Sequence, residues 1–152
     1  MREILFRGKR LDNGEWIEGD LVHSVYKIGD TCVGKFGWTL GMHKVDHYTV
    51  GQYTGLIDKN GVNIFEGDIV DLFGMNGKVV QEYGAFGIAF MKTIDYDLLE
   101  SKMPFNNSAN FCFNDNFISL WEVFWNYEQD GNPLYEVEII GNIHDNKELL
   151  EK

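Results

Sequence analysis

The abundance of glycine is the feature that most restricts how this chain folds. It contains seventeen glycines and only two prolines, and the glycines separate short runs of β-branched and aromatic residues. Asn13-Gly14, Asn60-Gly61 and Asp130-Gly131 are the clearest turn signals, because these residue types accept the positive φ angles that tight turns require. Short strands joined by such turns are typical of a mainly β fold, which we predict here.

Successive strands are predicted in the middle of the chain. They are rich in valine, isoleucine and phenylalanine, and we place turns between them at Asn76-Gly77 and at Gly84. The predicted strands cover residues 69–73, 78–83 and 86–90. Three consecutive strands joined by tight turns would form an antiparallel meander.

The most regular alternation of apolar and polar residues runs from Leu134 to Ile140. Tyr135, Val137 and Ile139 fall on one face of a strand there, and the two glutamates between them fall on the other. We therefore predict a strand with one buried face.

Helix is predicted in two places only. Residues 119–122 have the form of a capping box, with Ser119 at the N-cap and Glu122 three residues later, and predict a helix near 120–128. A strand is the alternative, because the segment is rich in aromatic residues. The tail, residues 146–152, predicts one or two helical turns. Residues 92–110 contain Pro104 and no sustained period, and predict the longest loop.

The charge balance excludes a broadly basic protein. Thirteen lysines and arginines stand against twenty-four acidic residues, a net charge of -11, whereas nonspecific affinity for nucleic acid comes from many cationic side chains. Residues 92–152 alone carry twelve acidic and four basic residues. One small basic patch is compatible with this balance, and the first ten residues supply its candidates: Arg2, Arg7, Lys9 and Arg10.

Targeting and redox motifs are few. The N-terminus has only three consecutive apolar residues, Ile4-Leu5-Phe6, and no stretch approaches the roughly twenty apolar residues of a membrane helix. We therefore expect a cytoplasmic protein that does not enter membranes. Cys32 and Cys112 lie eighty positions apart and form no CxxC pair, so we expect two thiols in a reducing compartment.

Two groups of side chains are candidates for metal binding. His43 and His47 have the HxxxH spacing that ligates zinc on a helix, although the neighbouring β-branched residues predict extended structure. Asp95 and Asp97 stand two positions apart in the predicted loop, a pattern that suits a hard cation such as magnesium. The chain contains no GxxxxGK[ST], GxGxxG, GxSxG or HExxH motif, and we predict no catalytic residue and no cofactor.

Three longer stretches resemble the signature segments of the YopX family, small proteins encoded by bacteriophages and prophages, chiefly of Gram-positive bacteria. The stretches read MREILFRGK over residues 1–9, VGQYTGLIDKNG over 50–61 with IFEGDIV over 64–70, and IIGNIHDNKELL over 139–150. They occur in the family's order and reach almost from end to end. The chain departs from the family at Lys147, where many relatives carry proline, and in an insert-like segment over residues 24–47.

The resemblance implies a small SH3-like β-barrel in a single domain over residues 1–152. We expect a barrel core over about 49–144, built mostly by strands between residues 64 and 90 and closed by a strand over 134–143. Strands of residues 1–48 would pack on this core or pair with another subunit. Short strands leave edges that oligomerisation covers, so we expect a homo-oligomer.

Three functions remain open at this stage. The first is a noncatalytic accessory protein of a phage or prophage, in the cytoplasm of a bacterial host cell, that binds a host protein with a basic surface. The second is a small barrel that binds nucleic acid through Arg2, Arg7, Lys9 and Arg10. The third is a metal-dependent enzyme with a site near the two histidines or the two aspartates. The resemblance transfers no catalytic residue or cofactor to this chain.

Overall fold

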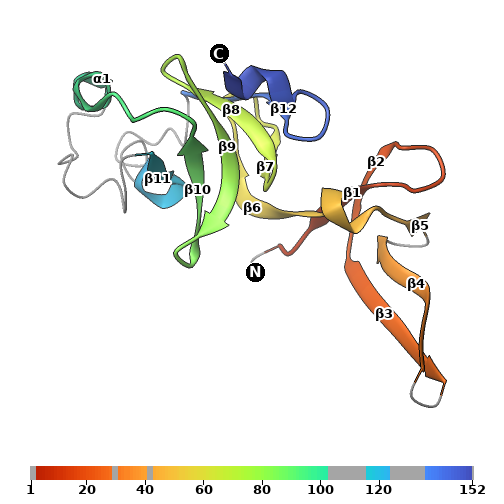
Figure 1. Ribbon diagram of the computed structural model, residues 1–152. Helices are drawn as coiled ribbons and strands as arrows, with labels where there is room; N and C mark the ends of the chain where they lie inside the picture. The colour runs from red at the N-terminus through yellow and green to blue at the C-terminus, as the bar shows by residue number, and fades with distance from the viewer. Residues whose placement is uncertain (1–2, 29–30, 41–42, 103–115, 124–135, 152) are drawn as a thin grey trace. The chain divides into compact units, whose positions relative to one another are not determined.

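The computed structural model describes residues 3–28, 31–40, 43–102, 116–123 and 136–151, with the backbone alone over 23–28, over 31–38 and at residue 100. Its contacts divide the chain into two compact units, Met1–Gly55 and Leu56–Lys152 (Figure 1). The expectation that residues 1–48 pack on the remainder stays a prediction.

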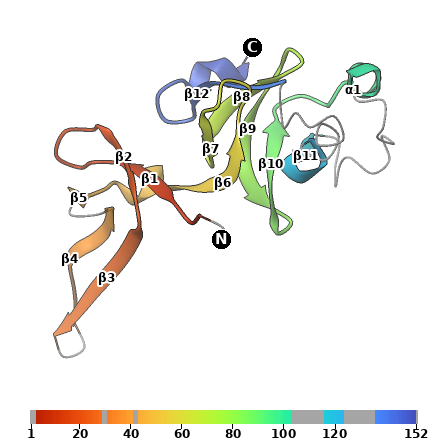
Figure 2. The same ribbon diagram turned by 180° about the vertical axis from the view of Figure 1, so that it is seen from behind.

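The first unit is formed by short antiparallel strands. They are β1 (Phe6–Lys9), β2 (Trp16–Gly19), β3 (Leu21–Ile28), β4 (Thr31–Leu40), β5 (His43–Lys44) and β6 (Gly51–Ile57), with the 3-10 helix η1 (His47–Thr49) before β6. The last two residues of β6 belong to the second unit. β1 pairs with β2 and with β6, while β3, β4 and β5 form a sheet in that order (Figure 2). The predicted turn at Asn13-Gly14 is confirmed, with Gly14 at a φ of 72° and the loop closed by a hydrogen bond from Arg10 N to Glu15 O.

Close packing connects β1 to the segment before β6. Lys9 N donates to Thr49 Oγ1 over 2.9 Å, and that hydroxyl donates to Asp46 O over 2.6 Å. A Cβ atom on Gly8 would lie 3.2 Å from Cβ of the buried Val45. A larger residue at position 8 would therefore push these segments apart.

The second unit contains a five-stranded antiparallel sheet in the order β11-β10-β9-β8-β12. The elements of the second unit are, in chain order, β7 (Asn63–Phe65), β8 (Asp68–Leu72), β9 (Met75–Glu82), β10 (Ala85–Phe90), the helix α1 (Tyr96–Lys102), β11 (Phe117–Ser119), β12 (Val137–Asn142) and the 3-10 helix η3 (Lys147–Glu151). The strand order ends at β11 on one side and β12 on the other, so the sheet is open within the described residues. The chain is mainly β, as predicted, but these strands form no closed barrel.

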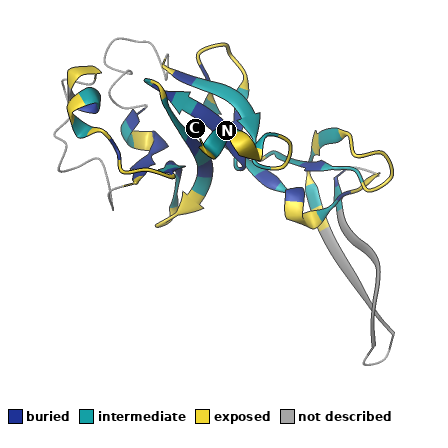
Figure 3. Ribbon diagram, turned by 45° about the horizontal axis from the view of Figure 1, so that its top comes forward, coloured by how far each residue is buried: buried dark blue, intermediate teal, exposed yellow. Residues whose placement is uncertain are grey.

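The core of the second unit includes side chains from this sheet, and buried residues recur along its strands in Figure 3. Its members are apolar side chains exposed by at most 4%, supplied by the strands, by the segment before α1, by α1 itself and by the helical residues 120–123: Ile64, Val70, Leu72, Val79, Ile88, Phe90, Ile94, Leu99, Ile118, Leu120, Val123 and Val137. The predicted alternation in the last strand is confirmed where it is described, since Val137 is buried, Glu136 is exposed and Ile139 packs against the core.

The central meander is confirmed, but one of its turns was placed wrongly. Asn76-Gly77 lies inside β9, and the turn is at Phe73-Gly74, with φ angles of 53° and 87°. Glycine is required at position 77 by close packing and not by a turn, because a Cβ atom there would lie 2.5 Å from Cγ2 of Ile88. The predicted turn at Gly84 is correct, and its φ is 76°.

The helix predictions have mixed outcomes. Residues 120–123 are helical, and Ser119 caps them by accepting hydrogen bonds from the N–H of Trp121 over 3.1 Å and of Glu122 over 3.4 Å. The predicted remainder, 124–128, lies outside the described residues, as do Asp130-Gly131 and Cys112. The tail forms η3, as expected.

The long loop predicted over 92–110 is wrong for residues 96–102, which form α1. Asp95 caps this helix by accepting a hydrogen bond from Leu98 N over 3.0 Å, and Leu99 is completely buried. Among the helices that the structure describes, none is long and apolar enough to cross a membrane.

Candidate functional site

Two of the candidate basic residues lie on one aromatic ring. The guanidinium carbon of Arg7 is 4.9 Å from the ring centroid of Trp16, and Lys9 Nζ is 5.4 Å from it. The register of β1 and β2 produces this arrangement, because Lys9 lies opposite Trp16 and Arg7 lies opposite Glu18. The Nε and Nη2 atoms of Arg7 are buried. These cation–π contacts hold β1 against β2.

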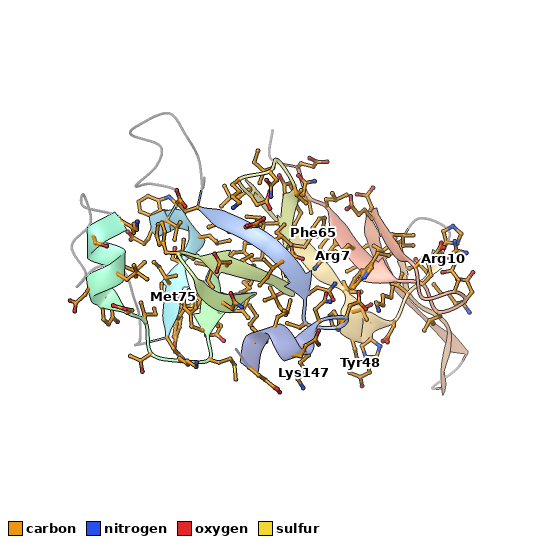
Figure 4. All side chains as sticks on the ribbon, turned by 90° about the horizontal axis from the view of Figure 1, so that it is seen from above. Arg7, Arg10, Tyr48, Phe65, Met75 and Lys147 are labelled. Atoms are coloured by element: carbon orange, nitrogen blue, oxygen red, sulfur yellow. The ribbon has the colours of Figure 1, made fainter. Side chains whose placement is uncertain are left out.

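Arg10 has a different environment. Its Nε donates to Asp12 Oδ1 over 2.8 Å, and this hydrogen bond holds the pKa of Asp12 below its ordinary value. Arg10 follows Lys9 directly, so in an extended backbone its side chain points to the other face. Arg2 lies outside the described residues. The described members of the predicted patch therefore divide between an aromatic contact and a local ion pair. Figure 4 labels Arg7 and Arg10, one from each group.

The two histidines do not share a helix. His43 lies in β5 and His47 begins η1. The extended structure predicted here is thus wrong over 47–49, where Asp46 caps η1 by accepting a hydrogen bond from Tyr48 N over 3.1 Å. The ring of His47 lies 3.9 Å from the ring of Tyr48 between centroids.

The two aspartates lie at the start of α1, with Asp95 at its cap and Asp97 in its first turn. Across the described part of the chain, no three side chains of histidine, cysteine, aspartate or glutamate come together in a group able to hold a metal.

The second unit contains a pocket of about 170 Å³ that the sequence did not indicate. Its walls come from three separate segments: the turn into β9, the segment from the end of β10 to α1, and η3. The lining residues are Gly74, Met75, Asn76, Phe90, Met91, Lys92, Thr93, Ile94, Asp95 and Leu150. No spacing rule connects three segments so far apart in sequence, and the residues that give the pocket its apolar character look like ordinary core material.

Hydrogen bonds hold the pocket walls in place. Asn76 Nδ2 donates to Leu149 O over 3.1 Å, which ties β9 to η3. The carboxylate of Asp95 is used at the cap of α1. Phe90 and Ile94 are buried, whereas Met91 is 64% exposed. The pocket thus has a fixed base and a flexible methionine at its rim.

A second structured feature of this unit is the buried carboxylate of Asp58. Its Oδ1 accepts hydrogen bonds from Asn60 N over 2.8 Å and Val62 N over 2.9 Å. Its Oδ2 accepts one from Ile139 N over 3.0 Å. The residue is only 3% exposed. Asp58 therefore shapes the turn at Asn60-Gly61, which is confirmed with Gly61 at a φ of 78°, and fastens it to β12.

The turn between β7 and β8 meets the C-terminal segment in the same way. Gly67, at a φ of 92°, donates from its N–H to Val79 O and accepts from Ile143 N, both over 2.9 Å. Asn146 Oδ1 accepts from Asn142 N over 3.2 Å, and a Cβ atom on Gly141 would lie 2.7 Å from that oxygen. The residues that carry the family resemblance in this unit thus meet in one hydrogen-bonded framework.

The negative net charge of the chain comes entirely from the second unit. Residues 1–55 hold seven basic and seven acidic side chains, whereas residues 56–152 hold six basic and seventeen acidic ones. The unit boundary at Gly55 divides the charge more sharply than the division at residue 91 that the sequence suggested.

Comparison with known proteins identifies the family. The family model "YopX protein" matches residues 5–151. Among solved structures the chain is similar to the crystal structure of protein EF1440 from Enterococcus faecalis, with 20% identity, 99% of each chain covered and a TM-score of 0.46. No curated protein matches the sequence. Because the family match spans nearly the whole chain, this protein belongs to the YopX family.

Proposed function

We propose that the chain is a noncatalytic accessory protein of a phage or prophage that binds another protein with a basic surface. The observation that carries this proposal is the charge division, because the second unit has eleven more acidic than basic residues while the first is neutral. A surface of one charge sign accelerates encounter with a partner of the opposite sign and disfavours partners of its own sign.

The size of the pocket also supports binding to a protein. Pockets that hold cofactors or drug-sized molecules measure roughly 300–1,000 Å³, and the pocket between β9, residues 90–95 and η3 is about 170 Å³. A pocket of this size accommodates one side chain of a partner.

A charge-reversal experiment tests the proposal. The full chain is immobilised and exposed to bacterial lysate at about 0.05 M and about 0.5 M salt, since screening shortens the reach of surface charges. A triple variant of exposed acidic residues in the second unit, Glu82→Lys, Asp97→Lys and Glu136→Lys, is expected to lose about tenfold or more of the salt-sensitive capture of basic proteins.

The matched control makes the same charge change in the first unit, with the exposed residues Glu3→Lys, Glu18→Lys and Asp20→Lys. It is expected to retain most of the capture. Equal loss in both triple variants would show that only total charge matters, and capture that does not respond to salt would contradict the proposal.

The second candidate function is nucleic-acid binding, and the observation that favours it is the contact of Arg7 and Lys9 with Trp16. Cationic side chains beside an indole ring are a common platform for stacked bases. Against it, Arg7 Nε and Nη2 are buried, and a buried guanidinium has little access to phosphate.

A gel shift separates this candidate from the first. We expect no shift of single- or double-stranded probes at micromolar protein. A shift that Arg7→Ala with Lys9→Ala abolishes, and that the control Lys44→Ala with Lys92→Ala retains, would favour nucleic-acid binding instead. Circular dichroism of each variant checks that folding is intact.

A further inference from the structure

We propose that the pocket between β9, residues 90–95 and η3 receives a single apolar side chain from a partner segment that carries lysine or arginine on either side of it. This inference rests on the proposed protein-binding function and adds the site and the chemistry of the bound segment.

The dimensions of the pocket define its occupant. A volume of about 170 Å³ is close to that of cavities of about 150 Å³ which hold one benzene molecule. A leucine, methionine or phenylalanine side chain has a comparable size. Met75, Phe90 and Ile94 supply apolar walls for it.

The pocket is formed before any partner arrives. Its base consists of Phe90 and Ile94, which belong to the core, and the hydrogen bond from Asn76 to Leu149 O fixes η3 beside β9. Figure 4 shows the region from above, with Met75 and Lys147 labelled. A pre-formed pocket binds with a smaller ordering cost than one that must be assembled, and this suits a single anchoring side chain.

The charged residues near the pocket indicate which residues should flank the apolar side chain in the partner segment. The segments that line it and continue directly from it are residues 71–76, 90–97 and 147–151. Their acidic residues are Asp71, Asp95, Asp97, Glu148 and Glu151, and their basic residues are Lys92 and Lys147. Among the lining residues themselves the charges balance, with one lysine, Lys92, and one aspartate, Asp95. The acidic excess therefore belongs to the neighbouring residues of these segments, and a partner side chain that is apolar, with cationic neighbours, matches a partly apolar pocket with acidic surroundings.

Two synthetic peptides of equal charge test the proposal on the full chain. One has the sequence acetyl-Gly-Lys-Leu-Lys-Gly-amide, and the other has serine in place of leucine. Binding is followed by NMR with methyl-labelled methionine, since two of the five methionines line the pocket. We expect the leucine peptide to bind at least about tenfold more tightly and to shift the methyl signals of Met75 and Met91.

Two matched variants locate the contact. Met91→Ser removes apolar surface from the rim of the pocket, and Val62→Ser removes a similar exposed side chain elsewhere in the same unit. We expect Met91→Ser to weaken the leucine peptide by about threefold or more, measured at the Met75 methyl, and Val62→Ser to leave its affinity unchanged.

The possible outcomes separate the two proposals. Equal binding of both peptides without a shift at Met75 would overturn the pocket and leave the acidic binding surface in place. Binding of neither peptide would overturn the pocket, while the lysate experiment decides independently on the protein-binding function. Signals of Met75 that change with protein concentration alone would identify a second copy of this chain as the occupant and overturn the basic partner.

Discussion

Asp58→Ala is expected to lower the free energy of unfolding by about 3–5 kcal/mol, because three backbone N–H groups lose one shared, charged and buried acceptor. Those donors belong to Asn60, Val62 and Ile139. The substitution loosens the turn after β6 and its attachment to β12 together. Urea unfolding followed by circular dichroism measures the loss as a lower midpoint.

Two further variants test whether the lost hydrogen bonds of the Asp58 carboxylate account for the lower stability. Asp58→Asn retains the oxygen that serves Asn60 and Val62 but presents an amide to Ile139, so we expect a loss of about half that of alanine. Asp71 is a matched control, since this half-buried carboxylate accepts one hydrogen bond of 3.3 Å from Gly74 N. Asp71→Ala should cost less than about 1 kcal/mol. A comparable loss at both positions would refute the role assigned to Asp58.

Gly87→Ala is the second substitution with a large expected effect, a loss of about 2–4 kcal/mol. Gly87 lies opposite Ser119 in the pairing of β10 with β11. A Cβ atom there would come far too close to the ring of Phe117, and would lie 2.6 Å from Ile118 O. β11 would have to move away from β10, which we expect to appear as a lower melting temperature.

A double-mutant cycle tests that mechanism. Phe117→Leu removes the aromatic ring that blocks a side chain at position 87, but it leaves the carbonyl of Ile118 in place. In the Phe117→Leu background, Gly87→Ala should therefore cost about 1 kcal/mol less than in the natural chain. Full additivity of the two changes would show that the ring is not the obstacle.

The turns show how far local sequence determines this fold. Asn13-Gly14 and Asn60-Gly61 are turns, as predicted, because asparagine and glycine accept positive φ. Phe73 and Tyr83 also adopt a φ of 53°, which is rare for bulky residues and which no turn rule predicts. At Phe73 the strand register decides the conformation: Leu72 pairs with Met75, so only two residues remain for the turn.

The helices were only partly predictable from local sequence. Ser119 was identified correctly from its capping pattern. α1 was missed because seven residues contain too few turns for a period to emerge, although Asp95 has the position of a cap and Leu98 and Leu99 follow it. The burial of Leu99 in the core stabilises a helix that is too short to persist by itself.

Even less of the candidate site could be predicted from the sequence, because tertiary structure determines what its residues contact. The basic N-terminal residues were chosen for their charge, but β1 turns Arg7 and Lys9 onto Trp16 and the loop turns Arg10 toward Asp12. The pocket is formed by residues that are apolar for the same reason as the core. Only the tertiary structure brings the half-buried Met75 and the exposed Met91 together at one pocket.

The hydrogen bond between Asp58 and Ile139 joins residues 81 positions apart, and this separation sets an order on folding during synthesis. The meander of β8, β9 and β10 involves neighbouring strands, so it can form as soon as Phe90 has left the ribosome. β12 is the last strand and covers the edge of β8. Until β12 emerges, the nascent chain carries an unpaired strand edge on β8 and an aspartate that lacks one of its three donors. Unpaired edges of this kind favour aggregation between incomplete chains.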